Sequence, residues 1–165
     1  MRRIIMLRGN SGSGKTTVAK LLQEKLGKNI FLLSQDTIRR DLLRVKDGFG
    51  TPAVQLLIHL VEFGYQHYDY VILEGILHSQ WYEPLFNRIT QLYGTNILAY
   101  YFDLSFEETI KRHQTRPQFH EFGTVEMKRW WLEKDYLTSV QEIIIGPNIK
   151  ADQLINQIMK DLDRQ

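Results

Sequence analysis

The stretch Gly9-Asn10-Ser11-Gly12-Ser13-Gly14-Lys15-Thr16 decides the fold class of this chain. It follows an apolar run over residues 3–8 and precedes an amphipathic segment over residues 15–26. Glycines at this spacing let backbone N–H groups converge on phosphate oxygens, and the N-terminus of the following helix adds a favourable dipole. A strand, this loop and a helix in succession therefore predict a phosphate-binding loop, or P-loop.

Within this loop, two side chains have distinct expected roles. Lys15 reaches the β- and γ-phosphates, and the hydroxyl of Thr16 binds Mg²⁺. No Asn-Lys-x-Asp motif that would read guanine is present. We therefore predict ATP as the co-substrate and Mg²⁺ as the cofactor. The residues predicted to bind ATP are Gly9, Asn10, Ser11, Gly12, Ser13, Gly14, Lys15, Thr16 and Thr17.

The hydrophobic pattern predicts an α/β fold. Short, nearly continuous apolar strands alternate with helices of ten or more residues, which is typical of a parallel sheet covered on both faces. Because parallel strands end at one edge of such a sheet, residues that follow the strands should meet there. We predict strands over residues 3–8, 30–34, 70–73, 96–102 and 142–145, and helices over residues 15–26, 37–44, 52–67, 80–93, from 105 onward, and 151–163.

Composition excludes several classes of protein. At 165 residues we expect one domain, residues 1–165, that needs neither disulfides nor structural metal. The chain has no cysteine, which excludes thiol catalysis and thiolate metal sites and favours the cytoplasm. The net charge of +2 is not that of a typical nucleic-acid binder. No stretch approaches the ~18 apolar residues of a membrane helix, so we expect no membrane partner.

Two acids and an arginine follow the predicted strands. Asp36 comes just after the second strand, where a carboxylate accepts the proton of an attacking hydroxyl; it would also suit the N-cap of the next helix. Arg39 lies one helical turn further, either facing the same cleft or solvated. Glu74 ends the third strand, where it would hold Mg²⁺ through water, touch the acceptor, or pair with an arginine. We predict that Asp36 and Arg39 act in catalysis and that Asp36, Arg39 and Glu74 bind the acceptor.

A lid is expected over approximately residues 112–128. Arg112 and Arg116 precede a stretch with Pro, Phe and Gly, and lid arginines neutralise charge that develops on a transferred phosphoryl group. Exposed ion pairs with Glu108 are the alternative interpretation. Trp130-Trp131, with Phe119, Phe122 and Tyr136, would either stack against a ring of the acceptor or pack the lid, and packing is the commoner role.

The chain resembles the nucleoside and nucleoside-monophosphate kinase group of P-loop proteins. Two segments, Leu32-Leu33-Ser34-Gln35-Asp36 and Val71-Ile72-Leu73-Glu74-Gly75-Ile76-Leu77, are similar to uridine kinase. The resemblance implies that Asp36 activates the 5′-hydroxyl of a nucleoside and that Glu74 lies at the edge of the active site. It also implies a P-loop NTPase sandwich with strand order 2-3-1-4-5 and a short lid. The segment Ile145-Gly146-Pro147-Asn148 lies where this group contacts adenine.

Several acceptors stay open at this point. The leading hypothesis is transfer of the γ-phosphoryl group of MgATP to a hydroxyl of a nucleoside, with Lys15, Asp36, Arg39, Arg112 and Arg116 in catalysis. The run Asp36-Thr37-Ile38-Arg39 also resembles the Asp-x-x-Arg of polynucleotide 5′-kinases, and antibiotic or sugar kinases share the same scheme. A nucleic-acid acceptor is less favoured. A non-catalytic ATP-binding regulator is the alternative from another class.

Overall fold

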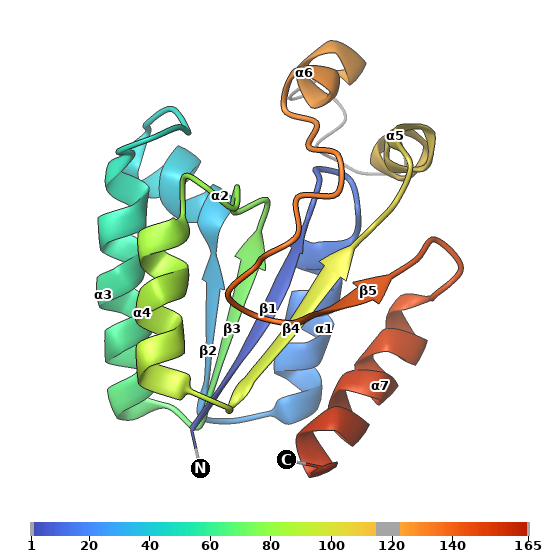
Figure 1. Cartoon of the computed structure of the whole chain (residues 1–165). Helices are drawn as coiled ribbons and strands as arrows, with labels where there is room; N and C mark the ends of the chain where they lie inside the picture. Colours follow the sequence, from blue (N-terminus) through green and yellow to red (C-terminus); the bar gives the residue numbers. More distant parts are fainter. Residues whose placement is uncertain (1, 115–122, 165) are drawn as a thin grey trace.

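The computed structural model describes residues 2–114 and 123–164, and its five strands form one parallel sheet (Figure 1). The strand order is β2-β3-β1-β4-β5, and each neighbouring pair runs parallel. This confirms the predicted fold class. The strands are β1 (Arg3–Gly9), β2 (Ile30–Ser34), β3 (Tyr70–Gly75), β4 (Ile97–Phe102) and β5 (Glu142–Ile145).

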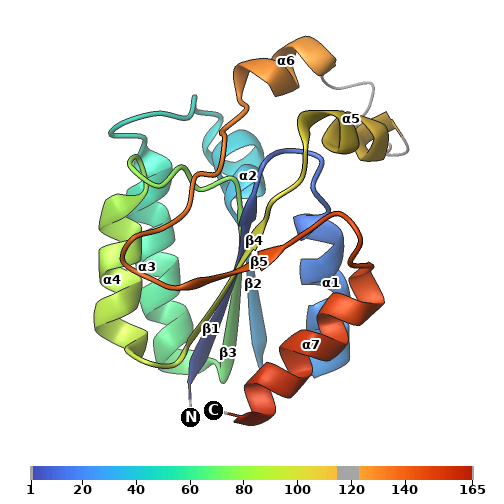
Figure 2. The ribbon, with the colours of Figure 1, turned by 45° about the vertical axis from the view of Figure 1, so that its right-hand side comes forward.

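Helices cover both faces of this sheet, as Figure 2 shows in a view close to the edge of the sheet. Helices α3 and α4 lie on one face, and α1 and α7 lie on the other. The helices are α1 (Lys15–Leu26), α2 (Gln35–Thr37), the π-helix η1 (Ile38–Leu43), α3 (Pro52–His67), α4 (Glu83–Tyr93), α5 (Phe106–Gln114), α6 (Thr124–Arg129) and α7 (Ala151–Arg164).

The core has two layers because successive side chains of a strand point to opposite faces. In β1, Ile4 and Met6 pack with α3 and α4, whereas Ile5 and Leu7 pack with α1 and α7. All four side chains are completely buried. Two-sided burial explains why the strands read as continuous apolar runs rather than as alternating ones.

Two predicted helices differ from the structure, and one observed helix was not predicted. The helix predicted over residues 37–44 begins at Gln35 and becomes π-helical from Ile38 to Leu43, so Asp36 lies within its first turn and is not its N-cap. The helix predicted over residues 80–93 begins only at Glu83, because Pro84 lacks an N–H and fits a first turn. The short helix α6, inside the predicted lid, had no periodic signal.

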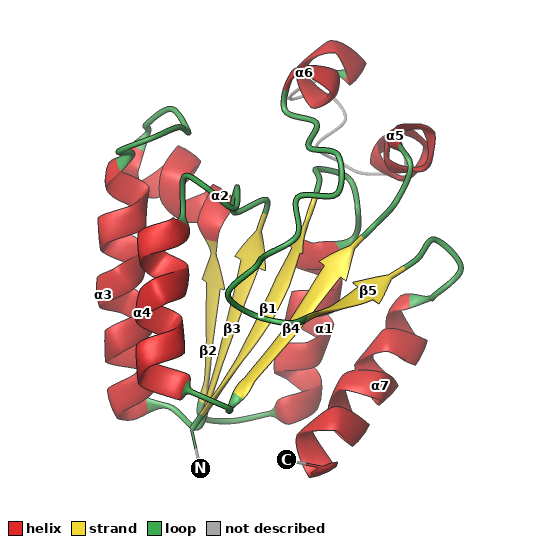
Figure 3. Cartoon of the chain, in the orientation of Figure 1, coloured by secondary structure: helices red, strands yellow, loops and turns green. Residues whose placement is uncertain are grey.

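Figure 3 shows that the carboxyl ends of the strands and the loops that follow them lie at one end of the molecule. The P-loop follows β1, Asp36 follows β2, and Glu74 lies at the end of β3, so three neighbouring strands deliver the predicted site residues to this edge. Among the described residues, no helix is long and apolar enough to cross a membrane.

Candidate active site

The P-loop closes around the side chain of Lys15, which is only 6% exposed. Its ammonium group donates to the backbone oxygen of Asn10 (2.8 Å) and to the Ser13 hydroxyl (3.3 Å). Gly14 precedes α1 with a left-handed backbone, φ 103°, which aims the first N–H groups of the helix at the loop. This arrangement holds a cation and a set of N–H donors where a phosphate chain would lie.

Gly12 has a role that the motif alone did not reveal. A Cβ atom added at Gly12 would lie 2.7 Å from the backbone oxygen of Thr109 in α5 and 3.0 Å from a methyl carbon of Met127 in α6. The P-loop is therefore pressed against α5 and α6, which overlap the two ends of the predicted lid. Glycine at this position permits that close approach as well as any contact with phosphate.

Thr16 and Glu74 lie together, as expected for a magnesium site. The Thr16 hydroxyl donates to the Glu74 carboxylate (3.2 Å), whose other oxygen accepts from the hydroxyl of Ser34 (2.5 Å). Glu74 is buried, and among the residues that the structure describes its side-chain partners are the hydroxyl groups of Thr16 and Ser34. Mg²⁺ is held by one or two protein oxygen ligands together with waters and phosphate oxygens, and these hard oxygen donors fit that chemistry. No group of three or more His, Asp or Glu side chains within residues 2–114 and 123–164 is arranged as a protein-only metal site.

Asp36 differs from Glu74 in its environment. It is exposed, and its carboxylate pairs with both Arg39 (2.7 Å) and Arg40 (3.3 Å). Arg39 also donates to the backbone oxygen of Val45 (3.2 Å), so it connects Asp36 to the loop that leads into α3. Asp36 is accessible to an acceptor, and an acceptor hydroxyl would replace one of these arginine contacts.

Arg112 joins three segments on the lid side. It pairs with Glu108 (2.7 Å) and donates to the backbone oxygens of Ser13 (3.1 Å) in the P-loop and Pro147 (2.9 Å) after β5. The hydrogen bond from Arg112 holds the pKa of Glu108 below its usual range. Arg112 therefore makes the predicted ion pair with Glu108 and also contacts the P-loop backbone, while its role toward a phosphoryl group stays a prediction. Arg116, Phe119, Phe122 and much of the predicted lid lie outside the described residues.

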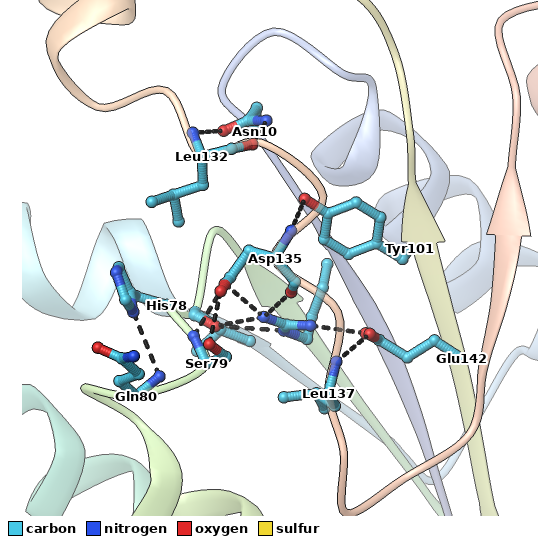
Figure 4. A network of polar contacts seen from close by, with 11 residues as sticks. Asn10, His78, Ser79, Gln80, Tyr101, Leu132, Asp135, Leu137 and Glu142 are labelled. Carbon is cyan, nitrogen blue, oxygen red and sulfur yellow. Dashed lines mark hydrogen bonds and ion pairs between the residues drawn. The ribbon is translucent and has the colours of Figure 1, made fainter.

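A segment that follows the lid is connected to the P-loop, and sequence analysis missed it. We call residues 131–137 the strap. The side chain of Asn10 forms two hydrogen bonds with the backbone of Leu132, at 2.7 and 2.8 Å (Figure 4). The amide group donates to the backbone oxygen and accepts from the backbone N–H of the same residue, as a residue in a paired β-strand does. The amide group of Asn10 therefore binds the strap, while its backbone oxygen accepts a hydrogen bond from Lys15.

A buried ion network holds the same strap at a second point. Arg8, completely buried and adjacent to the P-loop, pairs with Asp135 (2.9 Å) and Glu142 (2.7 Å). Asp135 also accepts hydrogen bonds from the backbone and hydroxyl of Ser79, in the loop after β3 (Figure 4). A charged residue inside a predicted apolar strand was the available signal, because an arginine is rarely buried unless it is paired.

A polar cluster joins Gln35, the residue before Asp36, to the loop that precedes α3 and to the loop that precedes α4. The Gln35 amide donates to Tyr82 (2.8 Å) and Asp47 (3.1 Å), and the Tyr82 hydroxyl donates to Asp47 (2.7 Å). Burial and, to a lesser extent, Asp47 raise the pKa of Tyr82 well above its ordinary value. Tyr82 therefore stays a neutral phenol that donates to the carboxylate.

The aromatic residues after the predicted lid serve mainly as packing residues. Trp131 packs edge-on against Phe106 at 5.2 Å, and Tyr136 packs edge-on against Tyr101 at 5.0 Å. Trp130 is 41% exposed. Trp131 and Phe106 also line a cavity of about 410 Å³ whose lining includes none of the predicted site residues.

Comparisons with known proteins agree with this geometry. A family profile described as an AAA domain matches residues 4–130. A gluconokinase from Sinorhizobium meliloti 1021 superposes with a TM-score of 0.70 at 15% identity, covering 99% of this chain and 94% of that one. No curated protein matches the chain significantly in sequence.

Two further solved structures show the same fold. The APS kinase of Mycobacterium tuberculosis, in complex with AMPPNP and APS, has a TM-score of 0.67 at 18% identity and covers 98% of each chain. A shikimate kinase from Bacteroides thetaiotaomicron has a TM-score of 0.59 at 14% identity, again with 98% of each chain covered.

Proposed function

Because the chain belongs to the AAA domain family, matched over residues 4–130, we propose that it is an ATP-dependent kinase that phosphorylates a hydroxyl of a small acceptor. One observation carries the proposal. Lys15 lies in the P-loop after β1, Thr16 donates to the buried Glu74 at the end of β3, and Asp36 is exposed just after β2, the next strand of the sheet. The similarity to small-molecule kinases supports it.

The proposed reaction assigns each group a step. Asp36 accepts the proton of the acceptor hydroxyl, the oxygen forms a bond with the γ-phosphorus, and the bond from that phosphorus to the bridging oxygen of ADP breaks. Lys15 stabilises charge on the β- and γ-phosphates. Thr16, with Glu74 acting through water, would hold Mg²⁺, which would neutralise charge on the phosphate oxygens.

Two arginines complete the proposed site. Arg112 already contacts the backbone of Ser13, and we assign it to the charge of the phosphate chain together with Arg116. Arg39 holds Asp36 and orients it toward the acceptor. We propose a nucleoside as the acceptor, on the similarity of the Asp36 and Glu74 segments to uridine kinase.

A panel of acceptors tests the proposal directly. ADP formation is measured with MgATP and nucleosides, sugars, aminoglycoside-like alcohols or 5′-hydroxyl oligonucleotides. We expect one class to stimulate turnover and Lys15→Ala to lower it by about 10²- to 10³-fold. Asp36→Asn should lose about 10²- to 10⁴-fold while still binding ATP. If ATP binds tightly and no acceptor stimulates turnover, the kinase assignment is wrong, and the result favours the alternative of a non-catalytic ATP-binding regulator.

A further inference from the structure

Three aromatic side chains gather on two loops whose residues Asp47 and Tyr82 accept hydrogen bonds from Gln35, the neighbour of Asp36. Phe49, in the loop before α3, meets Trp81 edge-on with ring centres 6.0 Å apart, and Trp81 stacks on His78 at 4.2 Å and 12°. We call Phe49, His78 and Trp81 the aromatic wall. Its two loops lie at the top of α3 and α4, at the carboxyl edge of the sheet (Figure 1).

Hydrogen bonds connect this wall to the catalytic edge. Asp47, two residues before Phe49, accepts from Gln35, the neighbour of Asp36. It also accepts from Tyr82, the neighbour of Trp81. The wall and Asp36 therefore keep a defined relation, since the same buried polar cluster positions both.

The far side of the wall is connected to the strap. Ser79, next to His78, donates through its backbone and its hydroxyl to Asp135 (Figure 4). The His78 ring in turn accepts a hydrogen bond from the backbone of Gln80 (3.2 Å). His78 and Trp81 thus form a firm stacked pair on a loop held at both ends.

Phe49 is the most exposed member of the wall. It is 74% exposed and lies between Gly48 and Gly50, whose φ values are 151° and 71°. A Cβ added at either glycine would meet no atom within 4 Å, so crowding does not explain the two glycines. Glycines in this region let the backbone rotate, and an exposed phenyl ring gains from covering an apolar surface.

A second aromatic group shows what simple packing looks like in this protein. Phe31 stacks on Tyr68 at 5.0 Å, and Phe63 packs on both Phe31 and His67 at the β2 edge. These residues belong to a strand, a helix and the helix end, and they close the edge of the sheet. The aromatic wall lies instead on two loops near Asp36, with its most exposed ring flanked by glycines.

From this geometry we propose that the aromatic wall binds a planar ring carried by the acceptor, with Phe49 closing over the ring after it stacks beside Trp81. The inference rests on the proposed function and names the chemistry of its acceptor: an alcohol that bears an aromatic heterocycle, such as a nucleoside, rather than a sugar or an open-chain polyol. Stacking on π faces recognises such a ring without reading each of its polar groups.

Fluorescence of Trp81 tests the wall without any turnover. Replacing Trp130 and Trp131 with Phe leaves Trp81 as the single tryptophan of the chain. We expect uridine to change the fluorescence of Trp81 and ribose to leave it unchanged. Phe49→Ala should weaken uridine binding by roughly ten- to a hundredfold, and Phe49→Tyr should retain it. Phe63→Ala, in the other aromatic group, is the matched control and should bind uridine as the parent does.

Binding and turnover together separate the two proposals. If uridine binds at Trp81 and no phosphoryl transfer follows, the aromatic wall stands and the kinase assignment fails. If transfer to a nucleoside occurs and Phe49→Ala leaves its KM unchanged, the wall is wrong and the kinase assignment stands. Equal use of ribose and uridine, or no fluorescence response to any of uridine, cytidine and adenosine, would also overturn the wall.

Discussion

The phosphate side and the acceptor side of the sheet edge are built differently. On the phosphate side, Lys15 and Ser13 are buried, and the loop is held by α5, α6 and the strap. On the acceptor side, Asp36 and Phe49 are exposed, and the loops are held by the cluster around Asp47 and by the Ser79–Asp135 contact. We conclude that the proposed co-substrate site is preformed, whereas the proposed acceptor side is more open.

The largest expected effect comes from removing what holds the strap on the phosphate side. Arg8→Met leaves two largely buried carboxylates without their cation, which should destabilise the protein by about 3–5 kcal/mol in urea unfolding. Arg2→Met is the control, because Arg2 is exposed and should change stability by less than ~0.5 kcal/mol. Similar stabilities for the two variants would mean that the strap network contributes little.

Glu74 connects the two sides, because its carboxylate accepts a hydrogen bond from Thr16 on the phosphate side and another from Ser34 on the acceptor side. In Glu74→Gln the carboxylate charge is lost, and we expect the Mg²⁺ concentration for half-maximal turnover to rise by about 10- to 100-fold. Magnesium titrations at saturating ATP measure this. Glu62→Gln, in a half-buried pair with Arg88, should leave the titration unchanged. An unaltered magnesium requirement in Glu74→Gln would remove Glu74 from the metal site.

The acceptor side should respond less strongly. Tyr82→Phe removes one hydrogen bond to Asp47 and one from Gln35, and we expect a loss of about 1–2 kcal/mol in urea unfolding. Tyr93→Phe is a matched control, because within the described part of the chain the buried Tyr93 hydroxyl has no hydrogen-bond partner. Its removal should be neutral or stabilising. A Tyr82 variant as stable as the Tyr93 variant would show that the polar cluster does not hold the loops.

The smallest effect concerns the titration of Glu108. Because Arg112 lowers the pKa of Glu108, the pair contributes stability above the ordinary glutamate pKa of ~4.3, and this contribution is lost as the pH falls through the lowered value. Arg112→Met should raise the Glu108 pKa toward the ordinary value in a carboxyl NMR titration. Glu62, whose pKa Arg88 lowers, serves as an internal reference and should not move. An unchanged Glu108 titration would show that the ion pair is absent in solution.

Some parts of the molecule could be predicted from the sequence and others could not, because some depend on local pattern and others on long-range contacts. The P-loop and most strand and helix bounds were predicted because they depend on local spacing and on burial of both faces. The start of α2 was wrong by two residues because Ser34, the residue before the helix, gives its hydroxyl to Glu74 and not to the helix end. Local capping signals cannot show such a long-range competitor. The catalytic roles of Lys15, Asp36, Arg39, Arg112 and Arg116 stay predictions.

The sequence by itself determined the fold class, the phosphate loop and the edge at which Asp36 and Glu74 meet it, because each follows from a short run of residues and from the rule that parallel strands end together. Only the tertiary structure decided that Asn10 binds the strap, that Arg8 pairs with Asp135 and Glu142, and that Phe49 meets Trp81. These contacts join residues 32 to 134 positions apart in the sequence. No local pattern encodes them, since they arise when packing brings distant loops to the same end of the sheet.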